Sequence, residues 1–343
     1  MLWFEKLMGF AETSPEQVQQ NIRLDGPRMT SLVNGKTYRH GQLEIASLSA
    51  LREQTKAHPP LGKMKPSGQN ALRAREVIGD VQDFHLWKEN KGALFQAASQ
   101  FNLLEMVNPT VRPEDGVGRY QYDRTQGPAC AIACGAGTIY RNYFVPVGDC
   151  TGQASGRQVD CLDALGDYFH NEKRQLWQVK NGYAFANEAG LHHIRDNIQS
   201  LSPQEYEELK GYLKVGIQWD TEVTIDVKEQ LVSQIYCSAL PVQYSSVASE
   251  HWEAFARLIL EATYEASFHA ALLNCRKTGN PKLYLTLVGG GVFGNEEEWI
   301  AESILSNLAR FAKQPLEVYF VSYGRSNPLV QQILARARQA GHL

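Results

Sequence analysis

The sequence feature that most constrains the fold is a glycine-rich turn between two apolar segments near the C-terminus. Residues 283–288 form a short apolar run rich in β-forming residues, and four glycines follow between positions 289 and 294. Apolar residues then recur over 296–311 at the spacing of one helix face, and a second apolar run spans 316–321. The pattern predicts a strand, a glycine-rich loop, a helix and a second strand, joined as a right-handed parallel crossover.

A loop of this kind suits a phosphate group, because glycine lets the backbone approach a ligand and the next helix N-terminus offers free N–H groups. The glutamates at 296–298 are expected to face solvent, since they would otherwise repel a phosphate. The glycine spacing also matches the dinucleotide-binding fingerprint, but the next strand ends in Ser322 and Tyr323, without the acidic residue that this fingerprint needs. A dinucleotide-binding fold and a purely structural turn stay open as alternatives.

Bulk properties narrow the class of protein. The chain has 343 residues, enough for one large domain or two, and a net charge of −3, which argues against bulk binding to nucleic acid. No apolar run approaches the ~20 residues of a membrane span, and the N-terminus lacks the pattern of a signal peptide. Six cysteines without a C-x-x-C pair predict reduced thiols in a cytoplasmic protein and no zinc site.

The chain divides at a segment rich in proline and glycine, residues 58–68. We expect an N-terminal α+β extension over residues 1–70 and an α/β domain over 71–343, interrupted by a polar, partly helical insertion at about 149–218. Strands are predicted at 75–81, 92–102, 138–147 and 231–238, and a long helix at about 250–274.

Four segments, in this order, resemble the macro domain family of ADP-ribose-binding proteins. They are VIGDV at 77–81, LFQAAS at 94–99, QIYCSALPV at 234–242 and LVGGGVFGN at 287–295. The resemblance implies a three-layer α/β/α fold with a mixed central sheet. Gln96 and Ser99 replace the asparagines of the second motif, and PEDGVG at 113–118 replaces a glycine-rich loop, which marks a divergent branch closer to hydrolases than to simple readers.

The resemblance implies ADP-ribose as the ligand, with no cofactor and no metal. Asp80 is expected at the adenine amino group, although capping of the next turn is the alternative, and the glycine loop is expected to hold the diphosphate. The implied ligand-binding residues are Asp80, Val81, Ser99, Asn102, Gly116, Val117, Gln126, Gly289, Gly290, Gly291, Val292, Phe293, Gly294, Asn295 and Tyr323.

Two carboxylates in one loop, Asp115 and Asp123, are the candidate catalytic residues. Cleavage of a glycosidic bond at the distal ribose needs one carboxylate to activate water, and a second acid can assist the leaving group. The alternatives are an Asp-Gly turn for Asp115 and a surface charge cluster of Asp123 with Arg124; Glu114 is a further candidate.

The sequence therefore predicts an ADP-ribosylhydrolase that removes ADP-ribose from modified protein, with no nucleic-acid or membrane partner. A non-catalytic ADP-ribose reader and an NAD-dependent oxidoreductase are the competing hypotheses. Adjacent histidines, His192 and His193, point apart on a helix and do not favour a metal site.

Overall fold

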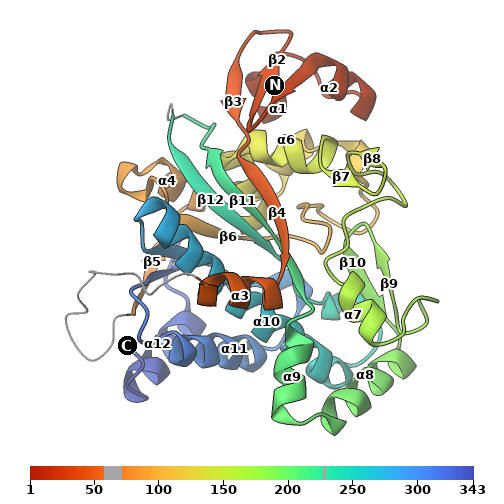
Figure 1. The fold of residues 1–343 in the computed structure, drawn as a ribbon, viewed down its shortest axis with the longest axis vertical. Helices are drawn as coiled ribbons and strands as arrows, with labels where there is room; N and C mark the ends of the chain where they lie inside the picture. Colours follow the sequence, from red (N-terminus) through yellow and green to blue (C-terminus); the bar gives the residue numbers. More distant parts are fainter. Residues whose placement is uncertain (58–71, 227–228) are drawn as a thin grey trace.

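A seven-stranded mixed sheet forms the centre of the molecule in the computed structural model, which describes residues 1–57, 72–226 and 229–343 (Figure 1). The predicted linker at 58–68 lies outside the described residues. Five adjacent strands run parallel, and β11 is antiparallel to both of its neighbours. The order across the sheet is β4 (Gln42–Ser47), β11 (Lys214–Glu222), β12 (Leu231–Cys237), β6 (Leu94–Ala98), β13 (Lys282–Leu285), β14 (Glu317–Ser322) and β5 (Arg73–Ile78).

Helices cover both faces of this sheet, which confirms the predicted α/β class. Alternate residues of a strand point to opposite faces. The Gln234 side chain of β12 donates to the Cys130 carbonyl on one face, whereas Cys237 contacts Ser267 on the other. One layer contains α4 (Val81–Leu86), α5 (Gln126–Ala133) and α6 (Gly135–Tyr143).

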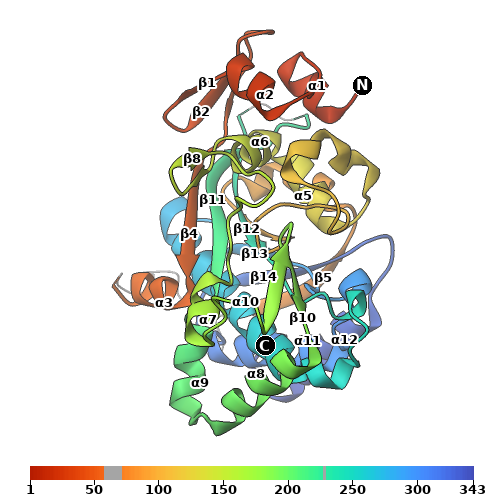
Figure 2. The ribbon, with the colours of Figure 1, turned by 90° about the vertical axis from the view of Figure 1, so that its right-hand side faces the viewer.

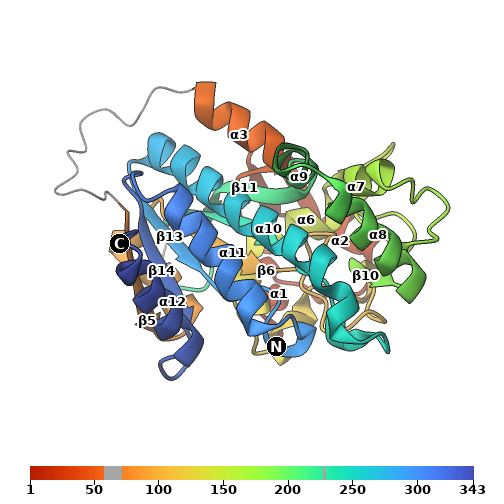
Figure 3. The ribbon, with the colours of Figure 1, turned by 90° about the horizontal axis from the view of Figure 1, so that it is seen from below.

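The opposite layer is built around α10 (Ser249–Thr278), whose long axis crosses the sheet beside α11 (Glu297–Arg310) (Figure 3). It also contains α3 (Leu48–Ala57), against α10, and α12 (Pro328–Gln339), against α11. None of the described helices combines the length and apolar character needed to cross a lipid bilayer.

The prediction of a strand at 138–147 was wrong, because these residues lie mostly in the helix α6. Their β-branched and aromatic composition favours a strand, but Ala136, Ile139 and Tyr143 have helical spacing and are buried together in a second apolar core. A methyl group on Gly135 would lie 2.6 Å from the Trp3 ring, so this helix depends on close contact with the N-terminal extension.

The N-terminal extension packs above α6 at one end of the molecule (Figures 1 and 2). Ser14 caps its second helix by accepting from the Gln17 N–H, and residues 28–30 pair with residues 37–39 in a hairpin. The predicted boundary at residue 70 does not separate two units, because β4 pairs with β11 in the central sheet. The extension contains α1 (Trp3–Met8), α2 (Pro15–Asn21), β1 (Ile22–Asp25), β2 (Arg28–Ser31) and β3 (Thr37–Arg39).

The insertion adds a hairpin and three helices beside the sheet. The strand β11 begins at Lys214, before the predicted end of the insertion at 218. Its elements are β8 (Cys150–Thr151), which pairs with β7 (Pro146–Val147), then α7 (Asp163–Tyr168), β9 (Trp177–Lys180), β10 (Tyr183–Ala186), α8 (Glu188–Ser200) and α9 (Pro203–Lys210). Helices α8 and α9 pack against α10, so this long helix supports the insertion as well as the sheet.

A buried carboxylate, Glu265 of α10, joins the extension and the insertion to this core. Its side chain is 1% exposed and accepts hydrogen bonds from Arg52 at 2.6 Å and from Arg310 at 3.1 Å, while the Lys210 ammonium lies 3.4 Å away. Burial opposes ionisation, but His269 and these cations outweigh it and lower the pKa of Glu265 below its usual range. The group is therefore anionic in the fold.

Replacement of Glu265 by glutamine is expected to lower the free energy of unfolding by about 3 kcal/mol, because Lys210 and Arg52 lose their most buried counter-charge. Both cations keep the more exposed Glu207 as a partner, at 2.7 and 2.8 Å, which limits the loss. Urea unfolding at pH 7 measures this difference. Glu302→Gln is the matched control: Glu302 pairs with Arg257 at the surface, so at most about 1 kcal/mol should be lost. Because the folded pKa of Glu265 is depressed, its contribution exists above the unfolded pKa of about 4.3 and should disappear as the pH falls below it. Equal losses in both variants at pH 7 would contradict this assignment.

Candidate functional site

The carboxyl ends of the five parallel strands meet at one edge of the sheet, where open α/β folds bind ligands. Several predicted ligand residues follow directly on these strands. Asp80 follows β5, Ser99 follows β6, the glycine loop follows β13 and Tyr323 follows β14. Parallel pairing therefore brings together residues from distant parts of the chain.

The glycine loop adopts a conformation that requires glycine at several positions. Gly289, Gly291 and Gly294 all have positive φ angles, of 87°, 59° and 67°. An added methyl group would lie 2.0 Å from the Gln243 side chain at Gly294, whereas it would meet nothing at Gly291. The buried Asn295 side chain closes the loop from inside by donating to the carbonyls of Leu240 and Gly289, at 2.8 and 3.0 Å. Asn295 thus shapes the loop instead of lining its outer surface.

The outer surface of the loop offers free hydrogen-bond donors. Gly291 and Val292 are exposed, and within the described part of the chain neither backbone N–H donates a hydrogen bond. The three glutamates at 296–298 face solvent as expected, and Glu298 is paired with Arg336 at 3.0 Å. The loop therefore presents N–H groups to an anion without a carboxylate held against them.

Phe293 of the loop belongs to an aromatic cluster that the sequence did not reveal. Its ring centroid lies 5.5 Å from that of Tyr183 in β10 and 5.9 Å from that of Tyr244 in the short helix η4 (Val242–Tyr244). The Tyr183 hydroxyl donates to the Met106 carbonyl at 2.6 Å, in the loop after β6. The insertion therefore supplies one wall beside the glycine loop.

Asp123 lies between the short helix η3 (Gly118–Tyr122) and α5. It is half-buried and accepts one hydrogen bond, from the Thr125 N–H at 2.9 Å. Burial, the neighbouring Tyr244 and the negative charge of Asp123 raise the pKa of the Tyr183 phenol, which places this carboxylate within electrostatic range of the ring. Of the two predicted catalytic carboxylates, Asp123 is therefore the one whose charge acts on a ring of the aromatic cluster.

Asp115 has a different environment. It accepts from the Arg112 backbone N–H at 2.9 Å and from the Arg112 guanidinium at 3.1 Å. These bonds hold the pKa of Asp115 below its usual value. The neighbouring Glu114 accepts from the backbone and hydroxyl of Ser155, in the insertion. Asp115 is thus bound within its own turn, and Glu114 is bound to the insertion.

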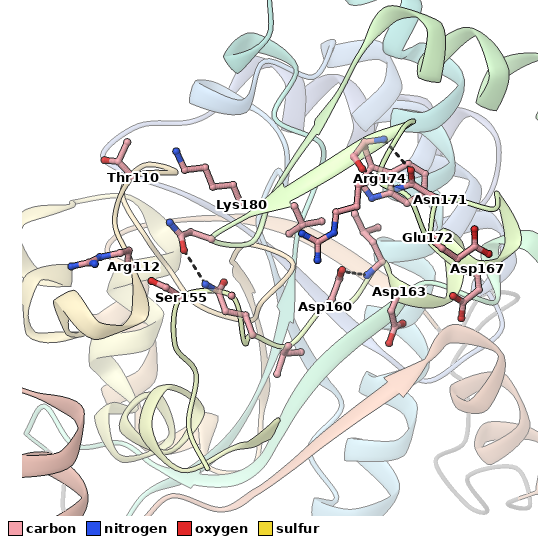
Figure 4. A pocket seen from close by; sticks show the side chains of 18 residues that line it. Thr110, Arg112, Ser155, Asp160, Asp163, Asp167, Asn171, Glu172, Arg174 and Lys180 are labelled. Carbon is pink, nitrogen blue, oxygen red and sulfur yellow. Dashed lines mark hydrogen bonds between the residues drawn. The ribbon is translucent and has the colours of Figure 1, made fainter. Parts of the chain in front are cut away.

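A cavity of about 630 Å³ lies within the insertion (Figure 4). Figure 4 shows Arg112 at one end, and Arg174 together with Glu172 and Asp167 at the other. Cationic and anionic side chains therefore both line the cavity. None of the predicted ligand residues lines this cavity. The volume of this cavity is therefore no reason to assign it to the site at the glycine loop.

A carboxylate of the N-terminal extension occupies the loop at 116–118. Glu12 accepts from the backbone N–H groups of Val117 and Gly118, at 3.0 and 2.7 Å, and from the Tyr143 hydroxyl at 2.6 Å. Burial raises the pKa of Glu12, although these donors favour its anion. Gly116 and Val117 are buried beneath it, so neither offers a free surface to a ligand here.

Asp80 and Tyr323 occupy the other end of the strand edge. Asp80 accepts from the Gln82 N–H at 2.9 Å and so caps α4, which was the alternative to its adenine role; Val81 begins the same helix and is buried. Tyr323 is 75% exposed. The loop that carries it is fixed by Glu76, which accepts from the Asn327 N–H at 2.7 Å.

Three polar residues near β6 are used inside the protein. The Ser99 hydroxyl donates to the Gln100 carbonyl at 3.1 Å, and Asn102 donates to Gln158 at 2.8 Å. The Gln126 amide bridges the end of β6 by accepting from the Ala98 N–H and donating to the Gln96 carbonyl. All three were predicted to bind the ligand, and the structure places them at or just beyond the carboxyl end of β6.

The fold is similar to solved structures of poly(ADP-ribose) glycohydrolases. The enzyme from Thermomonospora curvata aligns with a TM-score of 0.46 and 12% identity, over 94% of this chain and 95% of that chain. The enzyme from Deinococcus radiodurans, in complex with ADP-ribose, aligns with a TM-score of 0.46 and 12% identity, over 87% and 94%. No protein-family model and no curated protein matches the sequence.

Glu12→Ala is expected to lower the free energy of unfolding by about 1–3 kcal/mol, because two backbone N–H groups and the Tyr143 hydroxyl lose their acceptor. Hydrogen–deuterium exchange should then rise over residues 113–122. Glu12→Gln keeps one acceptor oxygen but sets its NH2 donor against one of the donors that Glu12 now accepts from, so it should also lose at least about 1 kcal/mol. Unchanged exchange in the alanine variant would show that Glu12 does not hold this loop.

Gly294→Ala is expected to destabilise the protein more than Gly291→Ala. Both residues have positive φ, which costs alanine about 1–2 kcal/mol, but only the Gly294 methyl group also collides with Gln243. The collision should add about 1–3 kcal/mol to the loss measured by chemical denaturation. Equal losses would mean that backbone strain alone explains both glycines.

Proposed function

We propose that the chain binds ADP-ribose at the carboxyl edge of the sheet and hydrolyses its bond to modified protein. The observation that carries the proposal is the exposed loop whose Gly291 and Val292 N–H groups are free beside Phe293. Free backbone donors at a glycine-rich loop suit a diphosphate. A half-buried carboxylate, Asp123, contributes to the raised pKa of Tyr183, a ring of the same aromatic cluster.

The strand order supports this ligand. Across the sheet, β6 is followed by β13, β14 and β5. The residues after these strands are Ser99, then the glycine loop, then Tyr323 and Asp80. ADP-ribose is a linear molecule of the same order: a distal ribose, a diphosphate and an adenosine. Strands lie about 4.8 Å apart, so the three gaps span about 14 Å along the edge. In the proposed pose the diphosphate lies between a ribose end near Ser99 and an adenine end near Tyr323 and Asp80.

Asp123 is the proposed general base. Its carboxylate takes a proton from a water molecule as the water oxygen bonds to the anomeric carbon of the distal ribose. The bond from that carbon to the protein side chain breaks, its electron pair stays with the leaving atom, and this atom takes a proton. Asp115 does not suit the acid role near neutral pH, because the Arg112 hydrogen bonds lower its pKa and keep it ionised. A solvent proton therefore completes the leaving group.

One observation favours a non-catalytic reader as the second candidate. Asp115 is held by Arg112, and Glu12 covers the 116–118 loop, so only Asp123 is left to do chemistry. A reader needs the glycine loop and no carboxylate. An NAD-dependent oxidoreductase is less well supported, since β14 ends in Ser322 where an acid is expected. The cytoplasmic location and the absence of nucleic-acid and membrane partners remain predictions.

The decisive measurements are calorimetric binding of ADP-ribose and NAD, and release of ADP-ribose from proteins that carry defined linkages. Asp123→Asn should bind ADP-ribose within about threefold of the parent protein but release it at least about 100-fold more slowly, as expected for loss of a general base. Asp115→Asn is the matched control from the same loop and should retain release. No release by the parent protein on any linkage leaves the reader, and a clear preference for NAD overturns the ADP-ribose assignment.

A further inference from the structure

Three metal-ligating side chains meet where the insertion packs on α10. Glu188 and His192 lie one turn apart on α8, and His251 lies in the first turn of α10. Their ligand atoms all lie within 4.8 Å of one another. The cluster shares no residue with the strand edge, so its chemistry is independent of ADP-ribose.

The distances within the cluster are close to those that a bound transition metal imposes. His192 Nε2 and His251 Nδ1 are 3.1 Å apart. Two nitrogens bound tetrahedrally at about 2.0–2.1 Å from zinc lie about 3.3 Å apart. Glu188 Oε1 is 4.0 Å from His192 Nε2 and 3.9 Å from His251 Nε2, which is not the His251 nitrogen that lies beside His192. Because an ion binds one nitrogen of each imidazole, either the Glu188 side chain must move toward His251 Nδ1 or the His251 ring must turn. The Glu188 side chain is 62% exposed, so a change of rotamer can close the remaining distance.

The arrangement also explains which of the two adjacent histidines matters. His193 is exposed and turned away, as expected for neighbours on a helix, whereas His192 is half-buried against α10. Its partner, His251, is far away in sequence, so no local motif announces the cluster. Without an ion, the two rings can share only one hydrogen bond, because one nitrogen must donate and the other must accept.

We propose that Glu188, His192 and His251 bind a zinc ion, with water in the fourth position. Two imidazoles and a carboxylate form a ligand set that suits zinc, and three protein ligands leave one coordination position open. The ion fastens α8 to the start of α10. Because α8 follows β10, and α10 follows η4, it also fixes the segments that carry Tyr183 and Tyr244.

The test uses the full-length protein, stripped with a chelator and dialysed against zinc chloride. Metal analysis should find one zinc per chain. Free zinc at about 100 times its dissociation constant should raise the melting temperature by about 3–4 °C. His192→Ala and His251→Ala should each weaken zinc binding at least tenfold and abolish this rise. His193→Ala, the matched control one residue away, should retain both.

Asparagine variants at the two ligand positions keep polarity and decide the question if an alanine variant does not fold. Zinc that fails to bind the parent protein overturns the site. So does zinc retained at full affinity by the His192→Asn, His251→Asn double variant, since the free thiols, such as exposed Cys150, would then be its ligands. Equal loss in His193→Ala would overturn it as well.

Discussion

The attachment of the N-terminal extension and of the insertion to the α/β core depends on the buried charge of Glu265. A carboxylate buried this deeply is tolerated only when cations surround it, and here they come from three different elements. Arg52 belongs to α3, Lys210 to the insertion and Arg310 to α11. Separation of any of these pieces from α10 would remove one of the cations that offset the buried charge of Glu265. The extension and the insertion are therefore integral to the α/β core, although each looks like an addition in the sequence.

Glu12 shows how the same residue type behaves when its partners are neutral. Its acceptors are filled by two backbone N–H groups and a tyrosine hydroxyl, which do not offset the cost of burying a full charge, and its pKa rises where that of Glu265 falls. Glu265 is consequently an anion in the fold, whereas Glu12, over the loop at 116–118, is a weaker acid. The contact over residues 116–118 is thus the one that proton exchange can loosen.

Local patterns in the sequence were enough to predict the elements that are defined locally. The strand, glycine loop and helix after Lys282 follow from apolar spacing and from glycines at positive φ. Contacts between distant segments were not predictable in this way. Tyr183 and Tyr244 carry no motif, and their place beside Phe293 exists only because β10 and η4 meet there. The helix α6 was mispredicted for the same reason, since its packing partner, Trp3, lies in the extension.

The aromatic rings of Phe293, Tyr183 and Tyr244 limit where the proposed hydrolysis could take place. The glycine loop supplies hydrogen-bond donors, which hold an anion but move no proton. The proposed base, Asp123, is linked electrostatically to Tyr183, which belongs to the insertion and packs beside Phe293 of the loop. In the proposed function, binding would therefore depend on the sheet edge, whereas hydrolysis would depend on the edge and the docked insertion together. A loosened insertion should convert the proposed enzyme into a reader, because the diphosphate donors of the loop would remain while the base lost its surroundings.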